Sequence, residues 1–421
     1  MEKITISPCA LKGTVTVPPS KSAAHRNIIL AALCDKVSVI SPACHSADID
    51  ATINCITALG AKVLEKNGAF YIEGIDKKAV AGKKVTLDCF ESGSTLRFMI
   101  PVAAALSVNA TFIGRGRLPE RPITPLTDIL KNMGVTCSSD HLPLEISGKL
   151  EKGEYLISGD ISSQYLTGLL FASVLTGGKP RLTTKLLSKG YVDLTIDILK
   201  AFGVDTLEKN GIYALNGSLK SGNYEIEGDW SQACFFLAAG ALGGEIEIKG
   251  LNLNSKQGDK VGLDLFKRLG ADITSKENSI FVKKGVVPQN DIEIDASQIP
   301  DMVPSLAVAA ALCGRKVRIF GAERLRIKES DRIKTVVNGL KALGVFVTEL
   351  PDGMEIFGKN PLSDGTVLGA NDHRIVMAFS VLAAFSKAKT EITDCFAINK
   401  SYPHFFEDFK ALGGNFTCHH K

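Results

Sequence analysis

Basic side chains recur at predicted helix starts, where the helix dipole disfavours them. In the segment PPSKSAAHR, Lys21, Ser22 and Arg26 open a run of Ala, Ile and Leu. A helix N-terminus carries roughly half a positive charge, so a cation there is destabilising unless an anion compensates. Comparable bases follow at Arg97, Arg121, Lys328, Arg332, Arg374 and Lys400. One such base is equally well explained as a solvated helix start, but a recurring set predicts a cavity that binds phosphates and carboxylates.

Neutral donors and two carboxylates accompany these bases. The neutral groups stand at two further predicted helix starts and are Ser162, Ser163, Gln164, Ser188 and Tyr191. Ordinary helix capping explains the serines equally well. Asp301 in IPDMVPS and Glu329 in KESDR stand among several cations. A site that only binds anions needs no carboxylates, whereas a site that transfers protons does. For Asp301, a helix cap remains the alternative.

Other kinds of chemistry find no support in the sequence. It contains no Walker loop, GxSxG elbow, HExxH motif or dinucleotide fingerprint, so we expect no nucleotide cofactor. The ten cysteines are scattered, mostly within apolar runs, and show no metal-ligand spacing. We therefore expect no metal, and reduced cysteines in a cytoplasmic protein.

The elements that position these side chains form a unit that the chain repeats six times. In each unit an apolar helix ends on a Gly-containing triplet, as at Leu59-Gly60-Ala61 and Leu343-Gly344-Val345, with a spacing of about 70 residues. The Gly is the residue expected at a helix C-cap. A strand, a turn and a second strand follow it. A longer helix precedes it and is apolar nearly all round, so we expect it to be buried. These longer helices are predicted at 22–33, 92–106, 162–175, 230–242, 301–314 and 371–384.

The two chain ends predict one discontinuous domain. The sixth unit lacks the second strand of its pair, whereas the chain opens with a strand, KITIS, that has no unit of its own. We expect this first strand to complete the last unit. Because 421 residues are too many for one core, three units per domain is the natural division. The predicted domains are 1–18 plus 229–421, and 19–228.

Composition excludes two further classes of function. The 49 basic and 45 acidic residues give a net charge of +4, too mild to support bulk binding of nucleic acid or membrane surfaces. The charged start of the chain predicts no signal peptide, and the longest apolar runs fall short of a membrane span.

Seven motifs carry a resemblance to a known family: PPSKSAAHR, ESGSTLR, RPI, SSQYLTGLL, KESDR, NDHR and INKSYPHFFEDF occur in this order over essentially the whole chain. Together they closely resemble the 3-phosphoshikimate 1-carboxyvinyltransferases, the EPSP synthases of the shikimate pathway. The resemblance implies two inside-out α/β domains, each of three βαβαββ units, with the active site in the cleft between them. It implies two small-molecule substrates, shikimate 3-phosphate and phosphoenolpyruvate, and neither cofactor nor metal. We expect a monomer.

The resemblance also assigns residues by position. Shikimate 3-phosphate would be held by Lys21, Ser22, Arg26, Ser162, Ser163, Gln164, Ser188, Tyr191, Asp301 and Lys328. Phosphoenolpyruvate would be held by Lys21, Gly93, Arg121, Gln164, Arg332, Arg374 and Lys400. Asp301 would take the proton of the shikimate 5-hydroxyl, while Glu329 and Lys21 would act on the methylene and phosphate side. The domain at 19–228 would bind shikimate 3-phosphate, and the discontinuous domain would supply phosphoenolpyruvate-binding bases with Asp301 and Glu329.

Three departures bear on the shape of the phosphoenolpyruvate pocket and on inhibition by glyphosate, which competes with that substrate in the family. Glu91 to Ser94 replace a common Asn-Ala/Ser-Gly-Thr, Phe98 stands where Pro is frequent, and Arg324 where Asn is frequent.

Two alternative functions stay open. A UDP-N-acetylglucosamine enolpyruvyl transferase has the same repeats but reads Lys-Asn at Lys21-Ser22. A non-catalytic anion-binding or nucleic-acid module is disfavoured by the two carboxylates and by bases without aromatic interleaving.

Overall fold

The chain forms two compact units, each with its own hydrophobic core. The structure, a computed structural model, describes residues 2–277, 279–287, 289–358 and 362–419. Unit 1 comprises Met1–Pro18 and Glu227–Lys421, and unit 2 comprises Pro19–Ile226. One buried cluster belongs to each unit, with Trp230 in the core of unit 1 and Phe98 in that of unit 2.

Three four-stranded sheets make up the rim of unit 2, in the orders β14-β3-β5-β4, β6-β7-β9-β8 and β10-β11-β13-β12. In each sheet the first two strands are parallel and the other neighbours are antiparallel. The strands are β3 (Ser38–Ser41), β4 (Lys62–Lys66), β5 (Ala69–Glu73), β6 (Lys84–Asp88), β7 (Asn109–Ile113), β8 (Thr136–Cys137), β9 (Leu144–Ser147), β10 (Glu154–Ile157), β11 (Lys179–Leu182), β12 (Val204–Lys209), β13 (Ile212–Gly217) and β14 (Asn223–Glu225).

Unit 1 repeats this plan with the sheets β16-β17-β15-β2, β18-β19-β21-β20 and β22-β23-β1-β24. Strand β1 lies between β23 and β24 and is antiparallel to both, which confirms that the first strand completes the last repeat. The strands are β1 (Lys3–Ser7), β2 (Lys12–Thr16), β15 (Glu245–Lys249), β16 (Ala271–Lys276), β17 (Ser279–Lys284), β18 (Ile292–Asp295), β19 (Lys316–Phe320), β20 (Phe346–Leu350), β21 (Gly353–Phe357), β22 (Gly365–Val367), β23 (Thr390–Thr393) and β24 (Asn415–His419).

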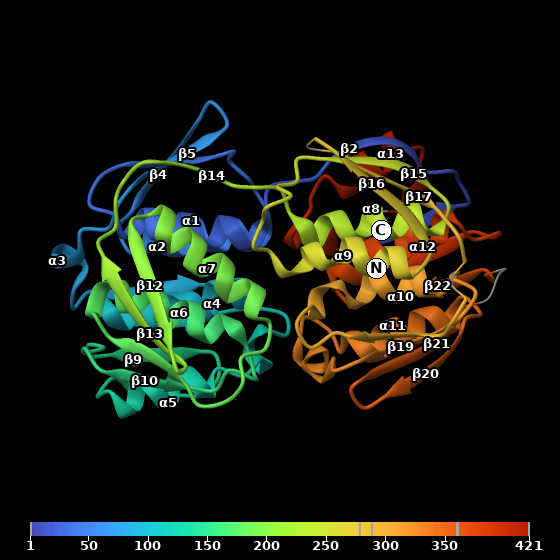
Figure 1. The fold of residues 1–421 in the computed structure, drawn as a ribbon. Coiled ribbons are helices and arrows are strands. Elements are labelled where there is room, and N and C mark those ends of the chain that lie inside the picture. Colours follow the sequence, from blue (N-terminus) through green and yellow to red (C-terminus); the bar gives the residue numbers. More distant parts are fainter. Residues whose placement is uncertain (1, 278, 288, 359–361, 420–421) are drawn as a thin grey trace. The chain divides into compact units, whose positions relative to one another are not determined.

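The predicted longer helices form the interior of each unit, with the sheets outside them (Figure 1). They are α1 (Lys21–Leu33), α4 (Gly93–Ala105) and α6 (Ser163–Thr176) in unit 2, and α8 (Trp230–Leu242), α10 (Val303–Ala310) and α12 (His373–Ala384) in unit 1. Every residue of α12 is buried, as expected for a helix that is apolar nearly all round. The fifth prediction was too long. Helix α10 ends at Ala310, because Leu312 and Cys313 donate to carbonyls three residues back in a tighter 3₁₀ turn.

The remaining helices complete the repeats. They are α2 (Ala47–Ala58), α5 (Thr124–Asn132) and α7 (Lys189–Ala201) in unit 2, α9 (Gly262–Arg268), α11 (Arg332–Ala342) and α13 (Phe405–Ala411) in unit 1, and the single turn α3 (Lys77–Val80). Short 3₁₀ helices are η1 (Leu118–Glu120), η2 (Gly258–Val261), η3 (Pro300–Met302), η4 (Glu323–Ile327) and η5 (Cys395–Lys400). The predicted fold class, two inside-out α/β units of three repeats each, is confirmed.

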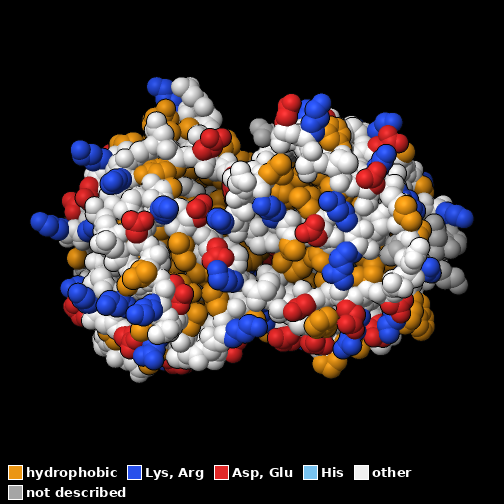
Figure 2. Space-filling view, in the orientation of Figure 1, with side chains coloured by type: hydrophobic (Ala, Val, Ile, Leu, Met, Phe, Trp, Pro, Cys, Tyr) orange, Lys and Arg blue, Asp and Glu red, His pale blue; other side chains and the backbone are white. Residues whose placement is uncertain are grey.

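The helices are short, and charged side chains of both signs lie on the visible surface. No helix among the described residues is both long and apolar enough to cross a bilayer. On the face seen in Figure 2, the Lys and Arg side chains of each unit alternate with Asp and Glu and do not gather into one basic patch.

Candidate functional site

The first helix of unit 2 presents a lysine that is already paired. Ser20 caps α1, its hydroxyl accepting from the backbone N–H of Ala23. Lys21 follows, and its Nζ lies 2.6 Å from Oδ2 of Asp48 in the first turn of α2. Both side chains are largely buried. Sequence reasoning missed Asp48, although an acid in the first turn of a capped helix is a common stabilising feature.

Arg26 is buried without a carboxylate partner in the part of the chain that the structure describes. Its Nε donates to Thr195 Oγ1 over 2.8 Å, its Nη1 to the carbonyl of Ser22 over 2.5 Å and its Nη2 to the carbonyl of Tyr191 over 3.0 Å. Its guanidinium also lies 5.2 Å from the centre of the Phe98 ring. Burial lowers the pKa of Arg26 to about 9. The structure thus brings Arg26 next to Ser22 and Tyr191, and the groups that solvate its charge are neutral.

Gly93 and Arg121 are in direct contact. Ser92 caps α4 and Gly93 is its first residue. A Cβ atom added to Gly93 would lie 2.7 Å from Cζ of the buried Arg121 guanidinium, so only glycine allows this approach. Arg121 lies directly after η1 and three residues before α5, ahead of the helix start at TPLTD.

Gln164 joins the same group of residues from α6. Its Nε2 donates to Ser94 Oγ over 2.9 Å, and its Oε1 accepts from Arg97 Nη1 over 2.6 Å. Residue Ser94 directly follows Gly93 in α4. The predicted phosphoenolpyruvate residues Gly93, Arg121 and Gln164 are therefore held in one cluster by α4, α6 and the end of η1.

The three serines differ in their surroundings. Ser162 caps α6 by accepting from the backbone N–H of Gln164 over 3.3 Å, so the capping interpretation accounts for it locally. Ser163 is buried in the first turn of α6. Ser188 precedes α7 with a φ of 54° and does not cap that helix with its side chain. A non-glycine residue in this left-handed region costs about 1–2 kcal/mol, which indicates that the surroundings impose the conformation.

In unit 1, Asp301 lies at the centre of three cations. Its Oδ1 is 3.0 Å from Arg332 Nη1 and 3.7 Å from Lys328 Nζ, and its Oδ2 is 3.2 Å from Arg374 Nη2. Arg374 Nη1 also donates to the backbone carbonyl of Asp301. Burial by itself would raise the pKa of Asp301, but Arg374, Lys328 and Arg332 together lower it well below its usual range. Asp301 is therefore ionised, and it is not the cap of α10.

Arg332, the first residue of α11, contacts three carboxylates. Besides Asp301, its Nη2 lies 2.7 Å from Glu329 Oε2 and its Nε lies 2.8 Å from Asp372 Oδ2. Although burial lowers the pKa of Arg332, Asp372, Glu329 and Asp301 raise it above its ordinary value. Asp372 is fully buried and also caps α12 by accepting from the N–H of Arg374. Sequence reasoning named the bases around Asp372 but not Asp372, whose place before the predicted helix at NDHR was the available signal.

Lys400 does not open a helix, which differs from the prediction. It is the last residue of η5, and helix α13 starts only at Phe405. Its Nζ donates to the carbonyl of Asn371 over 2.6 Å. Ala370 and Asn371 have left-handed φ angles of 52° and 51°, and this strained turn lies directly before Asp372, the cap of α12.

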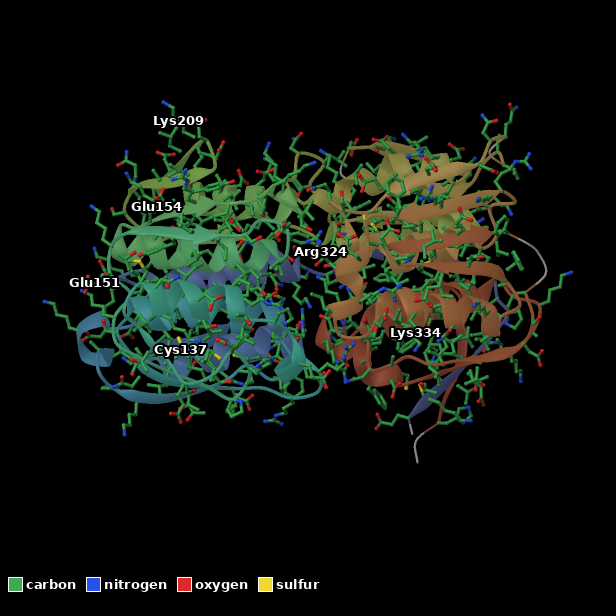
Figure 3. All side chains as sticks on the ribbon, turned by 90° about the horizontal axis from the view of Figure 1, so that it is seen from below. Cys137, Glu151, Glu154, Lys209, Arg324 and Lys334 are labelled. Atoms are coloured by element: carbon green, nitrogen blue, oxygen red, sulfur yellow. The ribbon has the colours of Figure 1, made fainter. Side chains whose placement is uncertain are left out.

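Two further charged side chains of unit 1 differ in their surroundings. Arg324, labelled in Figure 3, donates from Nη2 to the carbonyl of Ser297 over 2.6 Å and so is held by the backbone of its own unit. Asp259 is buried and accepts a hydrogen bond from the Ser231 hydroxyl. Burial and the nearby charge of Asp301 raise the pKa of Asp259 to about 6. Nothing in the sequence distinguished Asp259 from an ordinary surface acid.

The two clusters have distinct chemical capacities. The cluster in unit 2 offers buried cations, hydroxyls and helix N-termini, which is the chemistry of an anion receptor. The cluster in unit 1 offers carboxylates held among cations, which adds the means to move protons. In the described part of the chain, no group of three or more His, Cys, Asp or Glu side chains is placed to hold a metal ion.

Comparison with known proteins assigns the chain to one family. The family model for EPSP synthase (3-phosphoshikimate 1-carboxyvinyltransferase) matches residues 6–409. The 3-phosphoshikimate 1-carboxyvinyltransferase of Clostridium novyi is 42% identical and the alignment covers 98% of both chains. That of Clostridium acetobutylicum is 43% identical over 99% of this chain and 98% of its own. These matches do not favour either alternative, the UDP-N-acetylglucosamine transferase or the non-catalytic module.

Solved structures show the same fold. EPSP synthase from Acinetobacter baumannii superimposes with a TM-score of 0.82 at 24% identity, covering all of both chains. A second structure of the enzyme from that organism gives a TM-score of 0.80, also at 24% identity. At this identity the likeness establishes the fold of the units and does not assign roles to individual residues.

Proposed function

The chain belongs to the EPSP synthase family, the 3-phosphoshikimate 1-carboxyvinyltransferases, and we propose how its two clusters perform that transfer. The enolpyruvyl group of phosphoenolpyruvate passes to the 5-hydroxyl of shikimate 3-phosphate and phosphate is released. This reaction belongs to the shikimate pathway of aromatic amino-acid biosynthesis. We propose that the clusters of both units act on one pair of substrates.

The unit 2 cluster is proposed to bind shikimate 3-phosphate. The observation that carries this step is Arg26, a buried guanidinium with no carboxylate partner among the described residues. A charge of this kind is expensive to bury alone, and a bound anion offsets that expense. Around it stand the predicted partners Lys21, Ser22, Ser162, Ser163, Gln164, Ser188 and Tyr191.

Seven residues are proposed to bind phosphoenolpyruvate. They are Lys21, Gly93, Arg121 and Gln164 from unit 2, and Arg332, Arg374 and Lys400 from unit 1. Arg121 suits the carboxylate or phosphate because a guanidinium binds either group in bidentate fashion. The bare Cα of Gly93 leaves room for that guanidinium.

The proposed chemistry is addition followed by elimination. Asp301 takes the proton of the shikimate 5-hydroxyl as the hydroxyl oxygen attacks the second carbon of phosphoenolpyruvate. The methylene carbon gains a proton at the same time, and Glu329 and Lys21 are its proposed donors. The resulting tetrahedral intermediate loses a proton from its new methyl group and expels phosphate, which restores the double bond. Atoms balance without a redox step, and the arginines and lysines stabilise the developing charge.

Substrate binding explains how Asp301, whose low pKa makes it a weak base in the free protein, becomes a stronger base. In the free protein Arg374, Lys328 and Arg332 hold its pKa well below the usual range, against the effect of burial. Phosphate and carboxylate groups of the substrates compete for the same cations. Their negative charge therefore raises the pKa of Asp301 at the moment when the 5-hydroxyl arrives.

We also propose that the protein works as a monomer in the cytoplasm. All ten cysteines are free, which suits a reducing compartment. Every residue that the proposed reaction uses comes from one chain, so a second copy is not required for chemistry.

A coupled assay of phosphate release tests the proposal. The protein should release phosphate from phosphoenolpyruvate only when shikimate 3-phosphate is present. UDP-N-acetylglucosamine in its place should give no release, and neither should phosphoenolpyruvate alone. Release with UDP-N-acetylglucosamine, or none with shikimate 3-phosphate, would overturn the proposed function.

A further inference from the structure

A buried chain of polar side chains joins three helix starts of unit 2. His25 Nδ1 lies 2.7 Å from Thr52 Oγ1, which lies 2.7 Å from Thr95 Oγ1. Thr95 Oγ1 in turn lies 2.8 Å from Ser92 Oγ. The four residues belong to α1, α2 and the start of α4, and each is at most 1% exposed. None of them is among the residues proposed to hold a substrate.

This chain of polar side chains lies directly behind residues that are proposed to touch phosphoenolpyruvate. His25 follows Lys21 by one helical turn, and Thr52 follows Asp48 by one turn, so each pair shares a helix face. Thr95 follows Gly93 by two residues, and its Oγ1 lies 3.4 Å from the carbonyl oxygen of Asp48. The hydrogen bonds thus connect the Lys21–Asp48 ion pair to the turn at Gly93.

The hydrogen atoms of the chain can all point one way. Burial, reinforced by the charges of Lys21 and Arg26, lowers the pKa of His25 well below its usual range, so the imidazole is neutral. Its Nε2 has no hydrogen-bond partner among the described residues. We therefore assign the ring hydrogen to Nδ1, where Thr52 accepts it. Thr52 then donates to Thr95, and Thr95 to Ser92.

We propose that the chain His25–Thr52–Thr95–Ser92 is a positioning network that fixes the Lys21 ammonium relative to the Gly93 turn. This inference rests on the proposed function, which places both residues against phosphoenolpyruvate. A buried hydrogen-bonded network specifies one arrangement of the elements that it joins, whereas apolar contacts allow them to slide. Groups that bind a reacting substrate need placement to about 0.5 Å. Lys21 is proposed to bind both substrates, but Gly93 and the neighbouring Arg121 are proposed to bind phosphoenolpyruvate alone. Because the network sets Lys21 relative to the Gly93 turn, it should matter more for phosphoenolpyruvate than for shikimate 3-phosphate.

Thr52 offers the sharpest test, because valine replaces its hydroxyl by a methyl group of similar size. Thr52→Val should raise KM for phosphoenolpyruvate about tenfold to a hundredfold, the usual effect of a displaced binding group. The Kd of shikimate 3-phosphate, measured by calorimetry, should change less than about threefold. Thr52→Ser keeps the hydroxyl and should restore the wild-type KM. Ser173→Ala is the control, because it removes a buried hydroxyl that donates to Leu169 within α6.

A purely structural hydroxyl would give a different result. Thr52→Val would then lower the melting temperature and leave KM unchanged, or weaken both substrates equally, and either outcome would overturn the inference. The wild-type protein separates this failure from that of the proposed function. An inactive wild type overturns the function, whereas an active wild type with an unaffected variant overturns the network alone.

His25 supplies an independent pair of variants in case Thr52→Val does not fold. An Asn side chain places an amide N–H close to the position of Nδ1, while Gln carries its amide beyond it. His25→Asn should therefore keep KM for phosphoenolpyruvate near the wild-type value, and His25→Gln should raise it as Thr52→Val does. Equal KM values for the two variants would contradict the positioning role.

Discussion

The two units handle buried positive charge in opposite ways. Arg26 in unit 2 is surrounded by two carbonyls, a hydroxyl and an aromatic ring, all of them neutral. Arg332 in unit 1 is just as buried but contacts the carboxylates of Asp301, Glu329 and Asp372. The charge of Arg26 has no counter-charge until an anion binds, whereas the charge of Arg332 is already balanced by carboxylates. The comparison indicates an anion receptor in unit 2 and a network of ion pairs in unit 1.

This difference explains why carboxylates are present among groups that bind anions. A buried ion pair is seldom more stable than apolar packing of the same shape, so networks of this kind persist where they serve a specific purpose. In unit 1 the purpose would be to hold Asp301 ionised and Glu329 oriented until substrate anions compete for the cations. Each prediction below changes one side of the comparison.

The largest effect is expected for Asp301→Asn, which removes the proposed base and leaves an acceptor for Arg332. Turnover should fall by roughly 100- to 10,000-fold, the usual contribution of a general base. Binding of phosphoenolpyruvate should persist, because the cations remain. Steady-state kinetics and melting curves of the same variant decide the matter, since near-normal turnover with a lowered melting temperature would leave Asp301 only a structural role.

Glu329→Gln tests the other end of the proposed proton path. Exchange of solvent deuterium into the methylene group of phosphoenolpyruvate should slow by about 100-fold, because the group that serves this carbon loses its acidity. Mass spectrometry of recovered phosphoenolpyruvate measures the exchange. A variant that exchanges at the wild-type rate would restrict Glu329 to its pairing with Arg332.

Arg332→Met tests the balance of charge directly. The variant leaves Asp372 fully buried without its main partner, so the free energy of unfolding should fall by about 3–5 kcal/mol. Arg26→Met is the matched variant in unit 2. Because no buried carboxylate loses a partner there, its loss of stability should be less than about half as large, while shikimate 3-phosphate binds about tenfold or more weakly. Equal losses of stability, measured by urea unfolding, would remove the distinction between the units.

Asp259→Asn examines an acid that the unit 1 cations leave only partly balanced. The pKa of Asp259 is about 6 in the folded protein, above the usual 3.8, so the stability that comes from its protonated form is complete below pH 3.8 and is lost as pH rises through 6. Asparagine mimics the protonated acid and still accepts from Ser231. The variant should therefore gain on the wild type by about 2 kcal/mol between pH 4.5 and pH 8. A difference in unfolding free energy that does not vary with pH would show that Asp259 is not titrating there.

The sequence predicted the repeats well because their signals are local. Glycine after an apolar helix, and a helix that is apolar on every side, report on elements of one repeat, and the unpaired first strand correctly indicated where it pairs. The predicted length of α10 was wrong because a 3₁₀ turn and a continuing helix have the same apolar composition. The position of Lys400 was misjudged because a 3₁₀ helix gives no periodic signal of its own.

The chemistry was predictable only in part. Bases at helix starts stand out because they oppose the dipole, so Lys21, Arg26 and Arg332 were found. Their acidic partners Asp48 and Asp372 look like ordinary capping or first-turn acids in the sequence, since an acid there is favourable without any ligand. His25 and Thr52 were beyond reach for another reason. Their link depends on how α1 and α2 pack, and no spacing along the chain encodes it.

Gly93→Ala should have the smallest effect and sharpens the account of unit 2. The new Cβ would lie 2.7 Å from Cζ of Arg121, so the guanidinium must move away from its position. KM for phosphoenolpyruvate should rise about tenfold, and glyphosate should weaken with it if both ligands use Arg121. Binding of shikimate 3-phosphate to Arg26 should stay unchanged.

A double-mutant cycle with Arg121→Lys isolates the contact between Gly93 and Arg121. Lysine lacks the planar group that the new methyl would strike, so Gly93→Ala should cost less in the Arg121→Lys background than in the wild type. An interaction energy of about 1 kcal/mol in kcat/KM for phosphoenolpyruvate is expected. Additive effects would show that the alanine acts without displacing Arg121. The proposed binding of phosphoenolpyruvate by Arg121 would then lose its support, while Arg26 would still support an anion receptor at the shikimate 3-phosphate end.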